Sequence, residues 1–216
     1  MSSLQPPTNK CRIAVFVSGN GTNLQALVDH CKSGDIKGEI AAVVSNVKYA
    51  FALTRARNEN IETLIFEPDQ KSSRTELGFK IAKALKERNI DLICLAGYMM
   101  KIEPSLIRAF PNRIINIHPA LLPKYGGKGM FGHHVHEAVI TAKEKESGCT
   151  VHLVDEQFDH GPILGQAKVL VSPDETPESL AEKIYPKEHD LYVSIVKKIC
   201  SGALNLDTVP PVTEPS

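Results

Sequence analysis

The chain has 216 residues, of which 42% are hydrophobic and 23% charged, as in an ordinary globular domain. Lys plus Arg equals Asp plus Glu, at 25 each. This balance argues against a nucleic acid partner, which would be bound mainly through its phosphate backbone. No stretch approaches the ~20 apolar residues that span a bilayer, so we expect no membrane partner. The five cysteines form no CxxC pair. We therefore expect free thiols and a cytoplasmic location.

Short apolar runs alternate with helical patterns up to about Pro119. The runs predict strands at residues 12–17, 40–44, 63–66, 92–96 and 113–117. Helical patterns lie between them, at residues 23–31, 50–58, 74–88 and 104–110. This alternation predicts βαβ units, and therefore an α/β fold with an open, mostly parallel twisted sheet and helices on both faces.

The alternation ends after Pro119. A loop rich in Gly, Pro and Lys is expected at 121–131, followed by a helix at 135–146, late strands at 150–154 and 163–171, and a long C-terminal helix at 178–200. We expect a single domain at 12–202, with a flexible N-terminal extension at 1–11 and a flexible tail at 203–216.

The segment SGNGTNL, residues 18–24, joins the first strand to the first helix. Its glycines allow positive φ angles and a close approach of backbone N–H groups to a ligand. A helix N-terminus also attracts anions. The segment lacks the Gly-Lys-Ser/Thr of a Walker A loop, and Leu24 replaces the third glycine of GxGxxG. A phosphate site and a plain turn capped by Thr22 or Asn23 are about equally compatible with it.

Polar residues at two further places are candidates for chemistry. Asn116 and His118 end the strand at 113–117 and share one of its faces, at the edge where parallel sheets bind ligands. The loop at 155–162 could supply a carboxylate to His118, although by itself it reads as an acidic hairpin. The apolar loop at 96–102 suits a flat heteroaromatic ligand, and core packing is the commoner meaning of such a stretch.

Two other features have competing interpretations. His133 and His136 are three residues apart, but no carboxylate or cysteine stands at a spacing that completes a metal site, so no metal is expected.

In the final helix Glu188 lies four residues after Ile184 and three before Leu191, on the inward stripe. An inward carboxylate needs donors, and either a ligand or a salt bridge could supply them.

Four of these segments, in order, resemble the folate-dependent formyltransferases: SGNGTNLQ, LAGYM, NIHPALLPKYGG and FDHGP. The resemblance runs from about Arg12 to Gly202. NIHPxLLP followed by an Asp loop marks formyltransferases and formyl-folate hydrolases in general, whereas SGNGTN is typical of the glycinamide ribonucleotide formyltransferases of purine synthesis. The resemblance implies a Rossmann-like formyltransferase fold. It implies transfer of the formyl group of 10-formyltetrahydrofolate to the amine of glycinamide ribonucleotide in de novo purine biosynthesis, without a metal.

The resemblance also implies roles for individual residues. The catalytic trio would be Asn116, His118 and Asp159, with Asp159 holding His118 in its charged form. The ribonucleotide would be bound by Gly21, Thr22, Asn23 and Glu188. The folate would lie along Arg74, Met99, Met100, Lys101, Ile102 and Asn116. The loop at 125–136 is longer than in short family members, and its histidines receive no role.

Three alternatives remain. A formyltetrahydrofolate hydrolase shares the same trio, but such relatives carry a regulatory domain before the catalytic strand, and eleven residues precede Arg12 here. A tRNA formyltransferase needs a C-terminal domain and a basic face. A non-catalytic nucleotide-binding module would not require Asn116 and His118 at a strand end. A monomer and a homodimer are equally compatible with the sequence.

Overall fold

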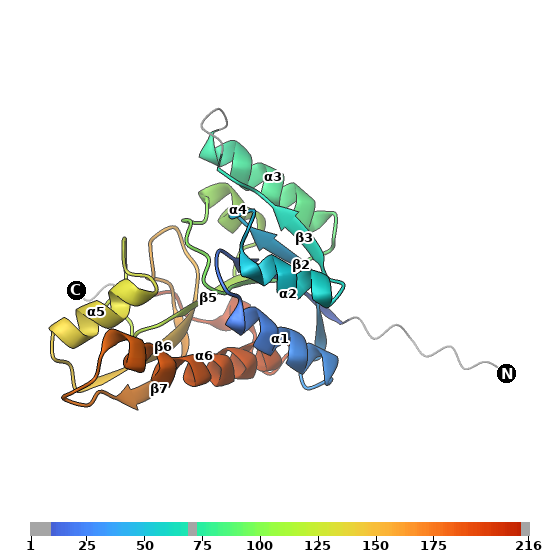
Figure 1. Ribbon diagram of the computed structural model, residues 1–216. Helices are drawn as coiled ribbons and strands as arrows, with labels where there is room; N and C mark the ends of the chain where they lie inside the picture. The colour runs from blue at the N-terminus through green and yellow to red at the C-terminus, as the bar shows by residue number, and fades with distance from the viewer. Residues whose placement is uncertain (1–9, 69–72, 213–216) are drawn as a thin grey trace.

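The computed structural model describes residues 10–68 and 73–212. Its centre is a seven-stranded sheet of order β3-β2-β1-β4-β5-β6-β7 (Figure 1). The strands are β1 Cys11–Val17, β2 Gly38–Ser45, β3 Glu62–Ile65, β4 Leu92–Leu95, β5 Ile114–His118, β6 Glu146–Leu153 and β7 Ile163–Leu170. Neighbouring strands from β3 to β5 are parallel, whereas β6 is antiparallel to both β5 and β7. The open, mostly parallel sheet predicted from the sequence is confirmed.

Helices cover both faces of this sheet. They are α1 Thr22–Lys32, α2 Phe51–Asn58, α3 Arg74–Lys86, α4 Pro104–Ala109, α5 His133–Thr141 and α6 Pro177–Cys200, followed by the 3₁₀ turn η1 Leu206–Thr208. Strand β1 shows why two layers are needed. Ile13 and Val15 pack in one core cluster with α1, α2 and α6, while Ala14 and Phe16 pack in the other with α3 and α4. A strand buried on both faces explains the continuous apolar run in the sequence.

Helix α6 is attached to the centre of the sheet by one buried hydroxyl. The Tyr192 side chain is 1% exposed, and its hydroxyl lies 2.9 Å from the carbonyl oxygen of Leu95 and 3.3 Å from that of Ile115. Both carbonyls belong to strands whose ends carry candidate site residues. The hydroxyl therefore fixes α6 relative to β4 and β5, where a buried polar group without such acceptors would be costly.

The clearest differences from the predicted boundaries lie at the end of α5 with the start of β6, and at the C-terminal end of the domain. The helix expected at 135–146 ends at Thr141, because Lys143 adopts φ 52° and the amides of Lys143 and Glu144 bond back to the helix, at Ile140 and Val139. Glu146 then begins β6.

At the other end, Leu206 is 3% exposed and Asp207 pairs with Arg113 at 2.6 Å. The packed domain thus continues past Gly202, the boundary expected from the sequence. Residues 1–9 of the expected extension and 213–216 of the expected tail lie outside the described residues.

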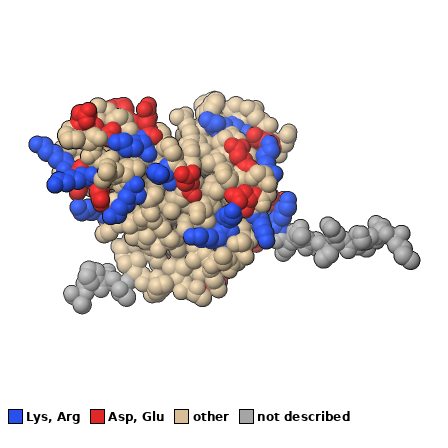
Figure 2. Space-filling model, turned by 90° about the horizontal axis from the view of Figure 1, so that it is seen from below, with Lys and Arg blue, Asp and Glu red and all other residues tan. Residues whose placement is uncertain are grey.

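The surface carries charges of both signs. On the face shown in Figure 2, acidic and basic residues are interspersed without an extended area of one sign. Within residues 10–68 and 73–212, no helix is both long and apolar enough to cross a membrane.

Candidate active site

A cavity of about 610 Å³ opens at the C-terminal ends of the parallel strands. The segments that follow β1 and β4 line it, together with the ends of β5 and β6, the loop before α5, the loop before β7 and one turn of α6. This is the edge at which parallel α/β sheets bind ligands, and the volume suits small molecules.

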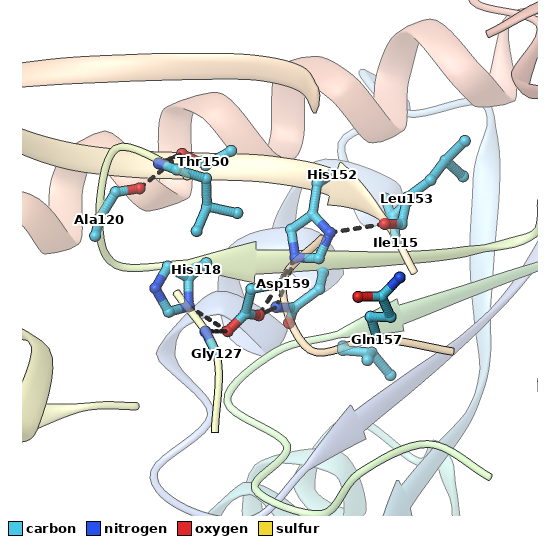
Figure 3. Close-up of polar contacts among 12 residues, drawn as sticks. Ile115, His118, Ala120, Gly127, Thr150, His152, Leu153, Gln157 and Asp159 are labelled. Carbon is cyan, nitrogen blue, oxygen red and sulfur yellow. Dashed lines mark hydrogen bonds and ion pairs between the residues drawn. The ribbon is translucent and has the colours of Figure 1, made fainter. Parts of the chain in front are cut away.

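Three residues predicted as a catalytic trio, Asn116, His118 and Asp159, line this cavity together. Figure 3 shows the Asp159 carboxylate directed toward the His118 ring. The Asp159 carboxylate lies 3.7 Å from Nδ1 of His118 and 3.5 Å from Nδ2 of Asn116. Asn116 and His118 share a face because they are two residues apart on β5, as the sequence predicted. Asp159 reaches them from the loop before β7 with φ 52°, a conformation that Asp tolerates better than most residues.

His152 also belongs to this group, although the sequence reasoning missed it. It lies directly opposite Asn116 in the antiparallel pairing of β5 and β6. Its Nδ1 is 2.7 Å from the carbonyl oxygen of Leu153, so Nδ1 carries a proton. Its Nε2 faces the Asn116 amide at 3.2 Å and the Asp159 carboxylate at 3.6 Å. The His152 ring therefore contacts both Asn116 and Asp159 and helps to hold their side chains in place. The alternation of the strand predicted at 150–154 was the signal that could have found it.

Hydrogen bonds set the protonation of the central pair. Nε2 of His118 lies 2.7 Å from the Tyr125 carbonyl oxygen, which can only accept, so Nε2 carries a proton. In the neutral ring, Nδ1 is then left as a free acceptor facing Asp159. The Gly127 N–H also donates to Oδ2 of Asp159, at 2.9 Å.

The pKa directions agree with this arrangement. Burial lowers the pKa of His118, and the Asp159 charge and the Tyr125 carbonyl only partly offset it. Burial alone would raise the pKa of Asp159, but the neighbouring His152 and His118 and the Gly127 N–H hold it below its usual value. The resting pair is thus a neutral imidazole beside a carboxylate. This differs from the expectation that Asp159 keeps His118 charged, because the desolvation of the ring outweighs the attraction.

Backbone contacts hold the segment after His118 in place. The Thr150 hydroxyl donates to the Ala120 carbonyl at 2.6 Å and accepts from the Leu122 amide at 3.0 Å. Gly126 lets this segment approach Asp159, since a Cβ atom there would lie 3.1 Å from the Asp159 Cβ and 2.7 Å from a Leu122 methyl carbon. Packing against β6 and Asp159 therefore helps to fix the segment between His118 and Gly127.

The glycine loop also lines the cavity. Gly21 is the N-cap of α1 with φ 73°, so the predicted cap by Thr22 or Asn23 was wrong, and no side chain competes with a ligand for the first amides. A Cβ atom on Gly21 would lie 2.6 Å from that of Ala52. Arg55, which the sequence reasoning did not single out, donates from Nε to the Asn20 carbonyl at 2.8 Å and places a positive charge beside the loop.

Glu188 faces inward, as its place in the helix predicted. It lines the cavity and is 6% exposed. The Asn23 amide donates to its Oε2 at 2.9 Å, which joins α6 to the glycine loop. Burial raises the pKa of Glu188 to about 7, and the Asn23 hydrogen bond only partly opposes this. Within the described residues no Lys or Arg lies within ion-pair distance of it, so its second oxygen remains available to a ligand's hydroxyl groups.

The expected folate side of the cavity is apolar. Met99, Met100, Lys101, Ile102 and Asn116 line the cavity, and Met99, Phe131, Phe158 and Tyr185 add large exposed side chains to its wall. Exposed apolar groups around a cleft are typical of a surface for a flat ligand. Arg74 does not line the cavity. It bonds instead to Glu103 at 2.5 Å and to the Lys101 carbonyl at 3.2 Å, so it supports this loop from outside.

The three histidines of α5 divide into two kinds. His133 pairs with Glu137 at 3.2 Å and faces Glu178 at 3.7 Å, while His134 faces Glu137 at 3.4 Å. His136 is buried and lines the cavity. In the part of the chain that the structure describes, no group of three or more His, Cys, Asp or Glu side chains could hold a metal ion.

Known proteins share this arrangement of sequence and fold. The model of a family described as "Formyl transferase" matches residues 11–196. A phosphoribosylglycinamide formyltransferase of Arabidopsis thaliana, described as chloroplastic, is 41% identical over 92% of this chain and 68% of its own. One from Haemophilus influenzae is 39% identical over 90% of each chain. The crystal structure of glycinamide ribonucleotide transformylase 1 from Symbiobacterium toebii has a TM-score of 0.88 and 36% identity, covering 98% of this chain and 97% of its own.

Proposed function

Because the chain belongs to the formyl transferase family, we propose that it transfers the formyl group of 10-formyltetrahydrofolate to the amine of glycinamide ribonucleotide. The products are formylglycinamide ribonucleotide and tetrahydrofolate, in purine biosynthesis. One observation carries the proposal. A single cavity joins the Asn116, His118 and Asp159 group to the anion-ready end of α1 and to the inward carboxyl of Glu188. The equal numbers of acidic and basic residues support small-molecule substrates rather than a nucleic acid, and the free thiols support a cytosolic location.

Different residues of the cavity wall suit different parts of the acceptor. The unpaired amides at the start of α1, with Gly21 at the cap and Arg55 nearby, suit the phosphate. Glu188 suits the two ribose hydroxyls, which can donate to its carboxylate. These contacts leave the glycinamide amine pointing along the cavity toward His118. The apolar wall around Met99 to Ile102 suits the folate, whose formyl carbon would then meet the amine beside the trio.

The trio can carry out the transfer without a covalent enzyme intermediate. The neutral amine attacks the formyl carbon, and the formyl oxygen gains negative charge that the Asn116 amide can stabilise; losing one such donor typically costs ~3 kcal/mol of barrier. Nδ1 of His118, free in the neutral ring, accepts the proton that the amine loses. The imidazolium is then paired with Asp159 and returns this proton to the folate nitrogen as the bond to the formyl carbon breaks. The proton count balances, since one proton moves from amine to leaving nitrogen.

A turnover experiment tests the proposal. The protein, 10-formyltetrahydrofolate and glycinamide ribonucleotide are mixed, and the deformylated folate is followed over time. We expect it to form only when the ribonucleotide is present. Release of formate in its absence would identify a hydrolase, and no turnover in either mixture would favour a non-catalytic binding module.

A further inference from the structure

His136 is a buried histidine in the wall of the cavity that the proposed mechanism does not use. It lies in the first turn of α5, and its side chain is 2% exposed. Its Nδ1 is fully buried without a hydrogen-bond partner. Among the described residues, no hydrogen bond is formed by its Nε2 either. A buried polar group left unpaired costs free energy. Nδ1 is enclosed by protein, whereas Nε2 is not fully enclosed, so Nε2 is the atom that a partner entering the cavity can reach.

The surroundings define the chemistry of that partner. Burial, with smaller contributions from the neighbouring His133 and His118, lowers the pKa of His136 to about 4. The ring is therefore neutral near pH 7 and offers one donor and one acceptor without charge. A neutral ring does not compensate a phosphate, which the anion-ready amides at Gly21 and Thr22 suit better. An uncharged polar group of the acceptor is the fitting partner.

We infer that His136 is a positioning residue for the formyl acceptor, hydrogen-bonding the uncharged amide that links its ribose to its amine. This inference rests on the proposed function. In that pose the phosphate lies at α1 and the ribose at Glu188, while the amine reaches His118; the amide passes between the last two. His136 lines the cavity together with both Glu188 and His118. Its hydrogen bond would orient the amine for attack without taking part in proton transfer.

The test is His136→Leu, which keeps an apolar volume and removes both nitrogens. Since the native nitrogens are unpaired in the free protein, this variant should be at least as stable as the wild type. Its KM for glycinamide ribonucleotide should rise about tenfold, while the KM for the folate stays unchanged. His136→Asn or His136→Gln, which restores a neutral hydrogen-bonding group, should recover part of the loss.

A matched control is available in the same chain. His189 also has a buried ring nitrogen without a partner, and burial lowers its pKa, but it does not line the cavity. His189→Leu should leave both Michaelis constants unchanged. A destabilised His136→Leu with an unchanged KM for the ribonucleotide would make His136 structural and overturn the inference. If the wild type itself does not formylate the ribonucleotide, the proposed function fails instead, so the two failures are distinct.

Discussion

Replacing Glu188 by glutamine separates the cost of burying this carboxyl from its contribution to substrate binding. Burial raises its pKa from 4.5 to about 7 in the folded protein. Between pH 4.5 and about pH 7 the folded state binds more protons than the unfolded state, so the free energy of unfolding falls as the pH rises. The cost of the buried group grows from near zero below pH 4.5 to a plateau above about 7. The plateau corresponds to about 3 kcal/mol, at ~1.4 kcal/mol per pH unit.

Glu188→Gln has nearly the same shape and no charge at any pH. We expect it to be more stable than the wild type, with an advantage that widens by about 2 kcal/mol between pH 5 and pH 8.5. Urea unfolding at these two pH values measures this difference. Glu182→Gln is the matched control, because Glu182 is exposed on the same helix, and it should show no such widening.

The same variant tests binding. Ribose hydroxyls donate to the ionised carboxylate, so the wild-type KM for the ribonucleotide should fall as pH rises through about 7. In Glu188→Gln this dependence should disappear, with a KM about tenfold higher at alkaline pH and an unchanged KM for the folate. A stability advantage that does not change with pH would refute the reasoning about burial. An unchanged KM for the ribonucleotide would make Glu188 purely structural.

Two further predictions concern the remaining parts of the site. His118→Ala and Asp159→Asn should each lower kcat by about 100-fold or more with near-native unfolding curves, and the double variant should lose far less than the product, because the two act as a unit. Full activity in either single variant would contradict this mechanism. Gly21→Val should raise the KM for the phosphorylated substrate more than Thr22→Ser does, because its β-branched side chain would adopt φ 73° and clash with Ala52. Equal use of phosphorylated and dephosphorylated substrate by the wild type would show that this loop does not bind phosphate.

Period and position were enough to predict part of the site. The spacing of two on a strand placed Asn116 and His118 on one face, and the helical period placed Glu188 inward. Both patterns are local, so the sequence carries them directly. The fold class followed in the same way from strands alternating with helices. Which residues from distant segments would line the cavity could be predicted only from the resemblance to known formyltransferases.

The contacts that the sequence did not predict depend on long-range register. His152 meets Asn116 because β5 and β6 pair antiparallel, and a shift of one residue would turn it to the other face. Tyr125 contacts His118 through its backbone carbonyl oxygen, and Gly127 contacts Asp159 through its backbone N–H, so no side-chain pattern could predict these contacts. Arg74 was placed on the folate side by motif alone, whereas its contacts are with Glu103 and Lys101.

The pKa of His118 depends on a balance between burial, which lowers it, and the charge of Asp159, which raises it. No sequence pattern predicts this balance, and its outcome, a neutral ring, suits a reaction in which an amine is the nucleophile. The attacking amine must lose a proton, so a neutral ring with a free Nδ1 is needed before the reaction. After proton uptake the ring is a cation 3.7 Å from the Asp159 carboxylate, where a buried site strengthens their attraction. Burial therefore favours the neutral ring before attack, and Asp159 makes the charged ring accessible after it. In Asp159→Asn only the first effect remains, so the pKa of His118 should fall further. The loss of activity should then persist at high pH, where the ring is neutral in both proteins.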